Sequence, residues 1–246
     1  MKKDDIRVGL EKPSILRLKK WLQWHRYKKQ HLKLHKNDLF YSVTPLLLEG
    51  ILKAFDIQSK RNMLNGGYYE FGIFKGFSLW YACTLSKFFE ANELSIYGFD
   101  SFEGLPNSPV DNSKPAFGEG HYCSSLEFVE NKLKELNVID MVSIFEGFYS
   151  ADHFNKIDSD FQDVSICVID CDVYESCVEV LNFIKPHLRN GSILLFDDYN
   201  CFLEDDNHGE RRALSEFENE NEWFDKKHIF DFGWHGAAFE VILKGD

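Results

Sequence analysis

Long apolar runs are missing from this 246-residue sequence, as are the motifs of several common protein classes. No stretch approaches the roughly 18 apolar residues of a membrane span, so we expect no transmembrane segment. The N-terminal residues lack the apolar core of a secretion signal, which predicts a cytoplasmic protein. The six cysteines form no CxxC pair and several lie in apolar runs, as is typical of reduced, buried thiols. His121, His153 and His208 lack metal-ligand spacing and are interpreted as background.

Positive charge is scarce after the first 36 residues. Residues 1–36 carry twelve Lys or Arg against three acids, whereas residues 37–246 carry sixteen against thirty-seven. A body with this excess of carboxylates repels phosphate backbones, so a nucleic-acid partner is not expected. We interpret residues 1–40 as a basic helical arm and residues 41–246 as one folded domain. The arm is expected to pack on an acidic surface of its own subunit or of a homodimer partner, with anionic lipid as the alternative.

Residues 163–200 predict a strand, a helix and a second strand. Residues 164–169 and 193–196 are apolar runs with the length of strands buried on both faces. Apolar side chains at helical spacing lie between them, and Pro186 is expected to divide that helix or end it early. Together these elements form a parallel βαβ unit, whose ligands lie beyond the carboxyl ends of the strands.

Both strands of this unit end in acidic residues. Asp170 and Asp172 follow the first strand, and Asp197 and Asp198 close the second. Because neighbouring strands lie about 5 Å apart, these carboxylates are expected to crowd together. A hard divalent cation relieves their repulsion, and oxygen ligands favour magnesium, calcium or manganese over zinc. The alternative interpretation is that the aspartates cap the turns that follow.

A second candidate site lies upstream, where a strand runs into Glu70, Gly72 and Gly76 and then into an apolar helix. Glycines at such a turn let the backbone approach a ligand, although the dinucleotide fingerprint GxGxxG is absent. The next strand ends at Asp100, an arrangement that favours a carboxylate binding the ribose of a nucleoside over an ordinary turn residue.

Loops supply the remaining candidates. Residues 103–125 are rich in Gly, Pro, Ser and Asn, and so long a loop in a compact domain predicts a lid. With residues 201–208 it is expected to shape a substrate pocket. A helix is expected from about Gly209, and strands over residues 142–145, 228–232 and 238–243. His235, in the loop between the last two, is interpreted as a surface residue, with substrate contact as the alternative.

Five motifs in this order resemble the macrocin O-methyltransferase family: EFGIFKG at 70–76, GFDSFEGLP at 98–106, IDCDVYES at 169–176, FDDY at 196–199 and GERRALSEF at 209–217. The resemblance spans residue 67 to the C-terminus. Members are class I enzymes that depend on S-adenosylmethionine and a divalent metal, and they methylate hydroxyls of antibiotic sugars and related natural products. One departure is Cys171, where the family commonly has glycine.

The resemblance implies an α/β, Rossmann-like class I methyltransferase fold, with a seven-stranded, mostly parallel sheet, helices on both faces and a reversed last strand. It makes residues 41–246 the methyltransferase domain. It implies Mg²⁺ ligands at Asp170, Asp197 and Asp198, and catalytic roles for Asp172, as general base, and Asp170. The implied S-adenosylmethionine contacts are Glu70, Phe71, Gly72, Gly76, Ser78, Asp100, Ser101, Phe102, Glu146 and Gly147.

Two other functions remain alternatives. Asp170-Cys171-Asp172 matches the DxD motif of metal-dependent glycosyltransferases, which bind nucleotide sugars. A non-catalytic module that retains a nucleoside pocket is the second. The acceptor is expected to be a small molecule with a hydroxyl group, such as a sugar or glycoside, and the sequence leaves its identity open.

Overall fold

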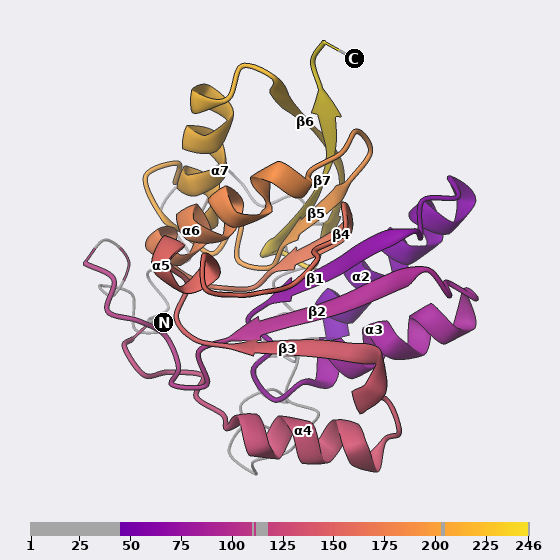
Figure 1. Ribbon diagram of the computed structural model, residues 1–246. Coiled ribbons are helices and arrows are strands. Elements are labelled where there is room, and N and C mark those ends of the chain that lie inside the picture. Colours follow the sequence, from indigo (N-terminus) through magenta and orange to yellow (C-terminus); the bar gives the residue numbers. More distant parts are fainter. Residues whose placement is uncertain (1–44, 110, 112–117, 203–204, 246) are drawn as a thin grey trace, which may run out of the picture.

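Seven strands form one sheet in the computed structural model, which describes residues 45–109, 111, 118–202 and 205–245. Their order across the sheet is β3-β2-β1-β4-β5-β7-β6 (Figure 1). β7 runs antiparallel to both of its neighbours, and the other pairings are parallel. The strands are β1 (Gly66–Phe71), β2 (Leu94–Asp100), β3 (Val142–Glu146), β4 (Val164–Ile169), β5 (Ile193–Phe196), β6 (Phe224–Phe232) and β7 (Gly236–Leu243).

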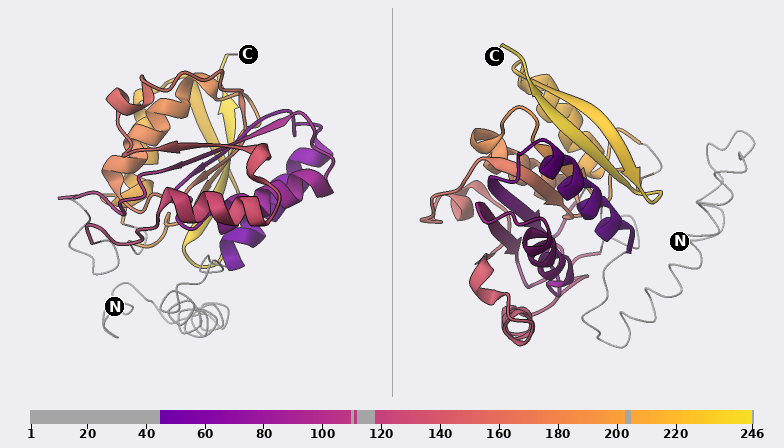
Figure 2. Two further views of the ribbon diagram at one scale, coloured as in Figure 1. Left: turned by 60° about the horizontal axis from the view of Figure 1, so that its bottom comes forward. Right: turned by 90° about the vertical axis from the view of Figure 1, so that its right-hand side faces the viewer.

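Helices cover both faces of the sheet, as the two views of Figure 2 show. They are α2 (Pro45–Lys60), α3 (Phe77–Phe88), α4 (Leu126–Glu135), α5 (Ala151–Phe154), α6 (Tyr174–Ile184) and α7 (Gly209–Glu220), with 3-10 turns at Ile139–Met141 and Lys185–His187. One core lies under α2, α3 and α4, and a second lies under α5, α6 and α7. Alternate strand residues enter the two cores, as Tyr68 and Tyr69 of β1 do, because successive side chains point to opposite faces. The predicted seven-stranded α/β architecture is therefore confirmed.

Most predicted elements have the expected bounds. β4 and β5 begin and end where the apolar runs do, and α6 stops at Ile184, immediately before the 3-10 turn that contains Pro186. β6 is longer than predicted and begins at Phe224, since residues 225–228 are polar and not buried but still pair with β7. None of the helices in the described part of the chain has the length and apolar content of a membrane span. The predicted arm, residues 1–40, and the dimer contacts expected of it lie outside the described residues.

Parallel register brings the candidate residues to one edge of the sheet. Phe71 of β1 pairs with Phe99 on one side and Ile169 on the other. Ile169 pairs in turn with Phe196 at the end of β5. The turns that follow β1, β2, β4 and β5 therefore lie side by side.

Candidate active site

The turn after β1 is too tight for any residue but glycine at position 72. Gly72 has a φ of 92°, and a Cβ there would lie 1.8 Å from the carbonyl oxygen of Asp170. Its N–H donates to the Phe99 carbonyl at 2.9 Å, and the Asp170 N–H donates to the Phe71 carbonyl at 2.9 Å. The glycine turn and the first acidic strand end are thus in direct backbone contact.

Asp100 joins the turns after β1 and β2. One carboxylate oxygen accepts from the Phe74 N–H at 2.8 Å and the other from the Phe102 N–H at 2.7 Å. Burial raises the pKa of Asp100 to about 6, although these hydrogen bonds oppose the shift. Phe74 and Phe102 have φ values of 47° and 58°, which are uncommon for bulky residues and cluster at ligand sites. The Ile73 N–H also contributes a backbone hydrogen bond to this carboxylate, which has about four acceptor sites in all, so Asp100 retains capacity to accept from a ligand hydroxyl.

Glu70 lies behind this turn, between β1 and α3. The Tyr68 hydroxyl donates to one of its oxygens at 2.6 Å and the Ser78 hydroxyl to the other at 2.5 Å. Burial raises the pKa of Glu70 to about 7, against the effect of both hydrogen bonds. Phe71 is also buried, with its ring stacked on Phe99 at 4.5 Å. Cofactor contacts from Glu70, Phe71 and Ser78 stay predictions, and the side chain of Phe71 faces the core.

The other predicted cofactor residues surround Asp100 or follow the glycine turn. The Gly147 N–H donates to the Asp100 carbonyl at 2.9 Å, and Glu146 pairs with Asp100 in the sheet. The Ser101 hydroxyl donates to the Gly104 carbonyl at 2.9 Å, and Phe102 is buried. Gly76, with a φ of 80°, precedes α3 and packs against α4, where a Cβ would lie 2.8 Å from a Val129 methyl carbon. The structure therefore gathers these residues along one edge of the sheet.

The acidic strand ends converge as predicted. Asp170, Asp172 and Asp198 each place an oxygen within 4.8 Å of the others, and Asp197, Asp198 and His235 form a second such group. Asp198 belongs to both groups, so the predicted trio of Asp170, Asp197 and Asp198 is divided between them. Burial, followed by the charges of neighbouring aspartates, raises the pKa values of Asp170 and Asp172 well above the usual range. Asp172 also has a left-handed φ of 62°.

The donor atoms of this cluster suit a hard divalent cation. Oδ1 of Asp197 is buried and has no hydrogen-bond partner among the described residues. Burial raises the pKa of Asp197 to about 6. The only nitrogen in either group belongs to His235, whose Nδ1 lies 2.6 Å from the Asp197 carbonyl. A carbonyl only accepts, so Nδ1 carries the proton and the free lone pair of His235 lies on Nε2. The other ligand atoms in the two groups are carboxylate oxygens, which magnesium and calcium prefer.

His235 corrects one prediction. The sequence interpretation made it a surface residue, but the side chain is buried and lies 3.4 Å from the Asp197 carboxylate. The loop between Gly233 and Gly236 turns it inward beneath the end of β5, where the Asn200 N–H donates to its carbonyl at 2.8 Å. An isolated histidine between glycines carries no sequence signal for this position.

Sequence reasoning missed three further residues at the cluster. Glu210, at the start of α7, accepts from the Asp198 N–H at 3.0 Å. The Cys201 thiol donates to the Asp198 carboxylate at 2.6 Å. Tyr122 comes from the loop after β2, and burial together with the charges of Asp172, Asp198 and Asp170 raises its pKa. Glu210 lies in the motif at residues 209–217, and nothing else in the sequence indicated that it would lie at the cluster.

Asp111 anchors the described part of the 103–125 loop to the N-terminal ends of α6 and α7. Its buried carboxylate accepts from the Tyr174 N–H at 2.7 Å, where α6 begins two residues after Asp172. It also accepts from the Gly209 N–H at 3.3 Å and lies 3.1 Å from Nδ1 of His208. His208, interpreted as background, thus links the loop at 201–208 to the loop after β2.

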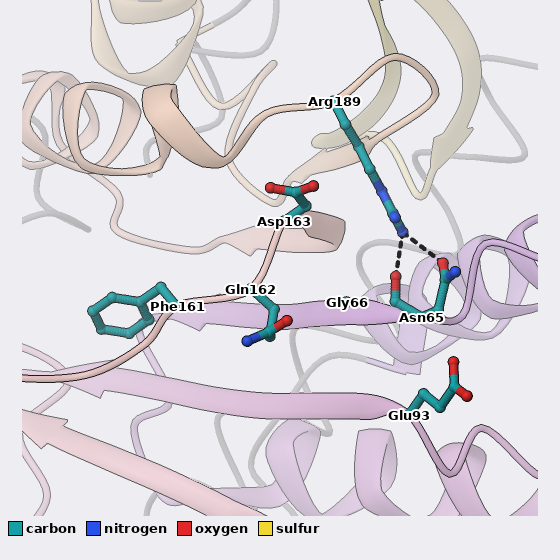
Figure 3. Close-up of a pocket in the computed structure, with 7 residues that line it drawn as sticks. All are labelled: Asn65, Gly66, Glu93, Phe161, Gln162, Asp163 and Arg189. Carbon is teal, nitrogen blue, oxygen red and sulfur yellow. Dashed lines mark hydrogen bonds between the residues drawn. The ribbon is translucent and has the colours of Figure 1, made fainter.

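A surface pocket elsewhere in the described structure is separate from this site. It has a volume of about 370 Å³ and is lined by Asn65, Gly66, Glu93, Phe161, Gln162, Asp163 and Arg189 (Figure 3). Gly66 begins β1 and Asp163 precedes β4, so the pocket lies at the amino ends of the strands. Arg189 is occupied there by hydrogen bonds to Asn65.

Comparison with known proteins identifies the family. A family model described as Macrocin-O-methyltransferase (TylF) matches residues 52–239. The chain belongs to the macrocin O-methyltransferase family. It is therefore an O-methyltransferase, which confirms the resemblance and favours methyl transfer over the glycosyltransferase alternative. None of the curated proteins compared matches the sequence.

Solved structures show the same fold for this O-methyltransferase. NovP, an O-methyltransferase, is similar with a TM-score of 0.69 at 18% identity over 82% of each chain. CalS11, a calicheamicin methyltransferase, is similar with a TM-score of 0.60 at 21% identity, covering 97% of this chain and 96% of its own. TomG from Streptomyces achromogenes, solved with its methyl donor SAM, is similar with a TM-score of 0.55 at 13% identity over 89% of each chain. The Rossmann-like class I methyltransferase fold is thereby confirmed.

Proposed function

We propose that this O-methyltransferase uses S-adenosylmethionine and Mg²⁺ to methylate a hydroxyl of a sugar or of a sugar-bearing natural product. The observation that carries the proposal is the contact between Gly72 and the Asp170 carbonyl. It joins a nucleoside-type glycine turn directly to a cluster of carboxylates. A methyl donor at the turn and an acceptor at the cluster would then be neighbours.

The surroundings of Asp100 support the cofactor assignment. Its carboxylate is held by backbone N–H groups, including those of Phe74 and Phe102, and keeps acceptor capacity for a ribose hydroxyl. Ser101, Phe102, Glu146 and Gly147 border it and would flank the adenine. The methionine end would lie along the backbone of the turn from Phe71 to Gly76, with Glu70 and Ser78 behind it. TomG, which was solved with SAM, has the same fold.

The acidic cluster supports the assignment of a Mg²⁺ site and of a hydroxyl acceptor beside it. Asp170, Asp197 and Asp198 would hold Mg²⁺, which when bound raises the acidity of a hydroxyl coordinated to it. The apo structure of CalS11, a TDP-rhamnose 3'-O-methyltransferase, shares the fold with a TM-score of 0.54 at 18% identity. A sugar hydroxyl is accordingly the proposed acceptor, presented at the partly accessible side of the cluster.

Asp172 is proposed as the general base. Burial, followed by the charges of Asp198 and Asp170, raises its pKa, which makes the ionised carboxylate a stronger proton acceptor. The sulfonium methyl of the donor is already activated, so transfer requires in-line attack by a correctly oriented hydroxyl oxygen. Asp172 would accept the proton as the oxygen attacks, with Asp170 beside it. Asp172 also has a left-handed φ of 62°, a backbone conformation that is found more often at functional sites.

Two substitutions separate the cation role from the cofactor role. Asp197→Ala is expected to lower turnover by roughly a hundredfold or more. Its affinity for S-adenosylhomocysteine should stay close to that of the parent. Asp100→Ala is expected to weaken S-adenosylhomocysteine binding by at least about tenfold, because hydrogen bonds to a charged carboxylate are lost. Calorimetric titration of both variants measures these affinities, and circular dichroism verifies folding. Equal losses of affinity in the two variants would contradict the assignment.

The remaining alternatives are tested with ligands. S-adenosylhomocysteine should raise the melting temperature of the full chain, whereas UDP-sugars should leave it unchanged. The reverse result would favour the glycosyltransferase interpretation. Methyl transfer to sugars with vicinal hydroxyls, followed by mass spectrometry, separates an active enzyme from a nucleoside-binding module.

A further inference from the structure

Glu210 is a fully buried carboxylate with no role in the chemistry described above. It is the second residue of α7, and its exposed fraction is 0%. One oxygen accepts from the Asp198 N–H at 3.0 Å. The other oxygen, Oε1, is buried and has no hydrogen-bond partner among the described residues. Burying a half-satisfied carboxylate is costly, so a functional reason for keeping it is expected.

The backbone around Glu210 is built to bring it to this position. Gly209 has a left-handed φ of 55°, and a Cβ there would lie 2.7 Å from the ring of Phe202. The Gly209 N–H is held by Asp111, which fixes the first turn of α7. Negative charge is also favoured at a helix N-terminus by the helix dipole. The fixed first turn of α7 therefore holds the Glu210 carboxylate next to the Asp198 N–H.

Direct binding of a cation by Glu210 is not what the geometry shows. Its oxygens belong to neither of the two groups whose ligand atoms lie within 4.8 Å of one another. Asp198, in contrast, belongs to both groups. A residue that fixes the backbone of Asp198 therefore sets the position of the one carboxylate that the two groups share.

We propose that Glu210 is a positioning residue for the cation site, which acts by holding the Asp198 backbone through its N–H. This inference rests on the proposed function, because it assumes that Asp198 binds a divalent cation. Groups that orient metal ligands without touching the metal commonly control its affinity. The hydrogen bond of Glu210 is to Asp198, so its expected effect is on the cation site.

Magnesium titration of the full-length protein by calorimetry, in the presence of saturating S-adenosylhomocysteine, tests the proposal. Glu210→Leu removes the acceptor while filling similar space, and it is expected to weaken Mg²⁺ binding by about tenfold or more. Glu210→Ala makes the same test if leucine is not accommodated. Glu210→Gln keeps an amide oxygen for the Asp198 N–H and should stay within about fivefold of the parent. Affinity for S-adenosylhomocysteine should be unchanged in every variant.

Glu220→Gln is the matched control, since Glu220 is exposed near the end of the same helix and should bind Mg²⁺ like the parent. Parental Mg²⁺ affinity in a folded Glu210→Leu or Glu210→Ala variant would overturn the proposal. A loss in Glu210→Gln as large as in Glu210→Leu would also overturn it, because the charge and not the hydrogen bond would then matter. If the parent itself binds no Mg²⁺, the proposed function fails at its cation, whatever Glu210 does.

Discussion

Glu70 and Asp100 lie at the ends of neighbouring strands, yet their surroundings give them different properties. Glu70 accepts hydrogen bonds from two side-chain hydroxyls and is sealed behind the glycine turn. Asp100 accepts from two backbone N–H groups and lies at the edge of the sheet. A hydroxyl can rotate to accept a hydrogen bond, whereas an amide N–H only donates. Glu70 is therefore the residue that tolerates protonation, and Asp100 the one that is held as an acceptor.

Stability should depend on pH through Glu70. Because burial raises its pKa from the ordinary 4.5 to about 7, the folded chain keeps a proton that the unfolded chain releases between these values. This proton's contribution to the free energy of unfolding is fully present below pH 4.5 and is lost as pH rises through 7. The loss is on the order of 3 kcal/mol. Glu70→Gln should flatten this decline. Urea unfolding of cation-free protein at several pH values between 4.5 and 8 measures it.

Asp100 and Asp197, whose pKa values are also raised, contribute in the same direction, so the relevant quantity is the difference between parent and variant. Identical pH profiles for parent and Glu70→Gln would show that Glu70 is ionised throughout this range.

At the scale of elements, α6 and α7 share one cap that comes from a loop distant in sequence. Both helices begin without a side-chain cap from their own N-terminal residue. The carboxylate of Asp111 accepts from the first N–H of each, at Tyr174 and Gly209. These two helix starts flank the acidic cluster, so the buried Asp111 side chain fixes the backbone on both sides of the cluster.

Removal of this shared cap should destabilise both helix starts together. Asp111→Ala leaves two buried N–H groups unpaired and is expected to cost roughly 2 kcal/mol or more of unfolding free energy. Hydrogen exchange should accelerate in the first turns of α6 and α7, whereas α3 should be unaffected. Asp158→Ala, at an exposed loop position, is the matched control. Unchanged exchange at α7 would mean that Asp111 caps α6 alone.

Elements with a strong local pattern were predictable, and loops were not. The apolar runs of β4 and β5 and the proline after α6 gave bounds that the structure reproduces. The acidic cluster followed from strand ends, because parallel strands end at a common edge. Asp111 and His235 lie in loops without periodicity, so nothing local indicated that they turn inward. β6 was predicted too short because residues 225–228 are a polar run without the alternation that marks a strand.

At the scale of the molecule, acidic charge dominates the domain and converges on one site. Residues 37–246 carry thirty-seven acids against sixteen basic residues, and four aspartates meet at the ends of β4 and β5. Repulsion within such a cluster opposes folding unless a cation or protons neutralise it. Folding and cation binding are therefore expected to be linked.

Mg²⁺ should stabilise the full-length chain against heat. At a concentration of about 100 times the dissociation constant, the gain is about 2.7 kcal/mol by mass action. Asp198→Asn should remove most of it, because Asp198 belongs to both carboxylate groups. Differential scanning fluorimetry with Mg²⁺ and with a chelator measures the shift. Sodium chloride at matched ionic strength controls for screening, and an equal rise with it would exclude a specific site.

The insertion of β7 between β5 and β6 has a consequence for biosynthesis. β5 is fully apolar, and its outer hydrogen-bonding groups are covered only when residues 236–243 arrive. While the nascent chain has not yet emerged beyond residue 235, β5 is an unpaired apolar edge strand that other nascent chains can pair with. The sheet edge at β5, whose end carries Asp197 and Asp198, is thus completed late in translation, and a polypeptide released early is expected to aggregate.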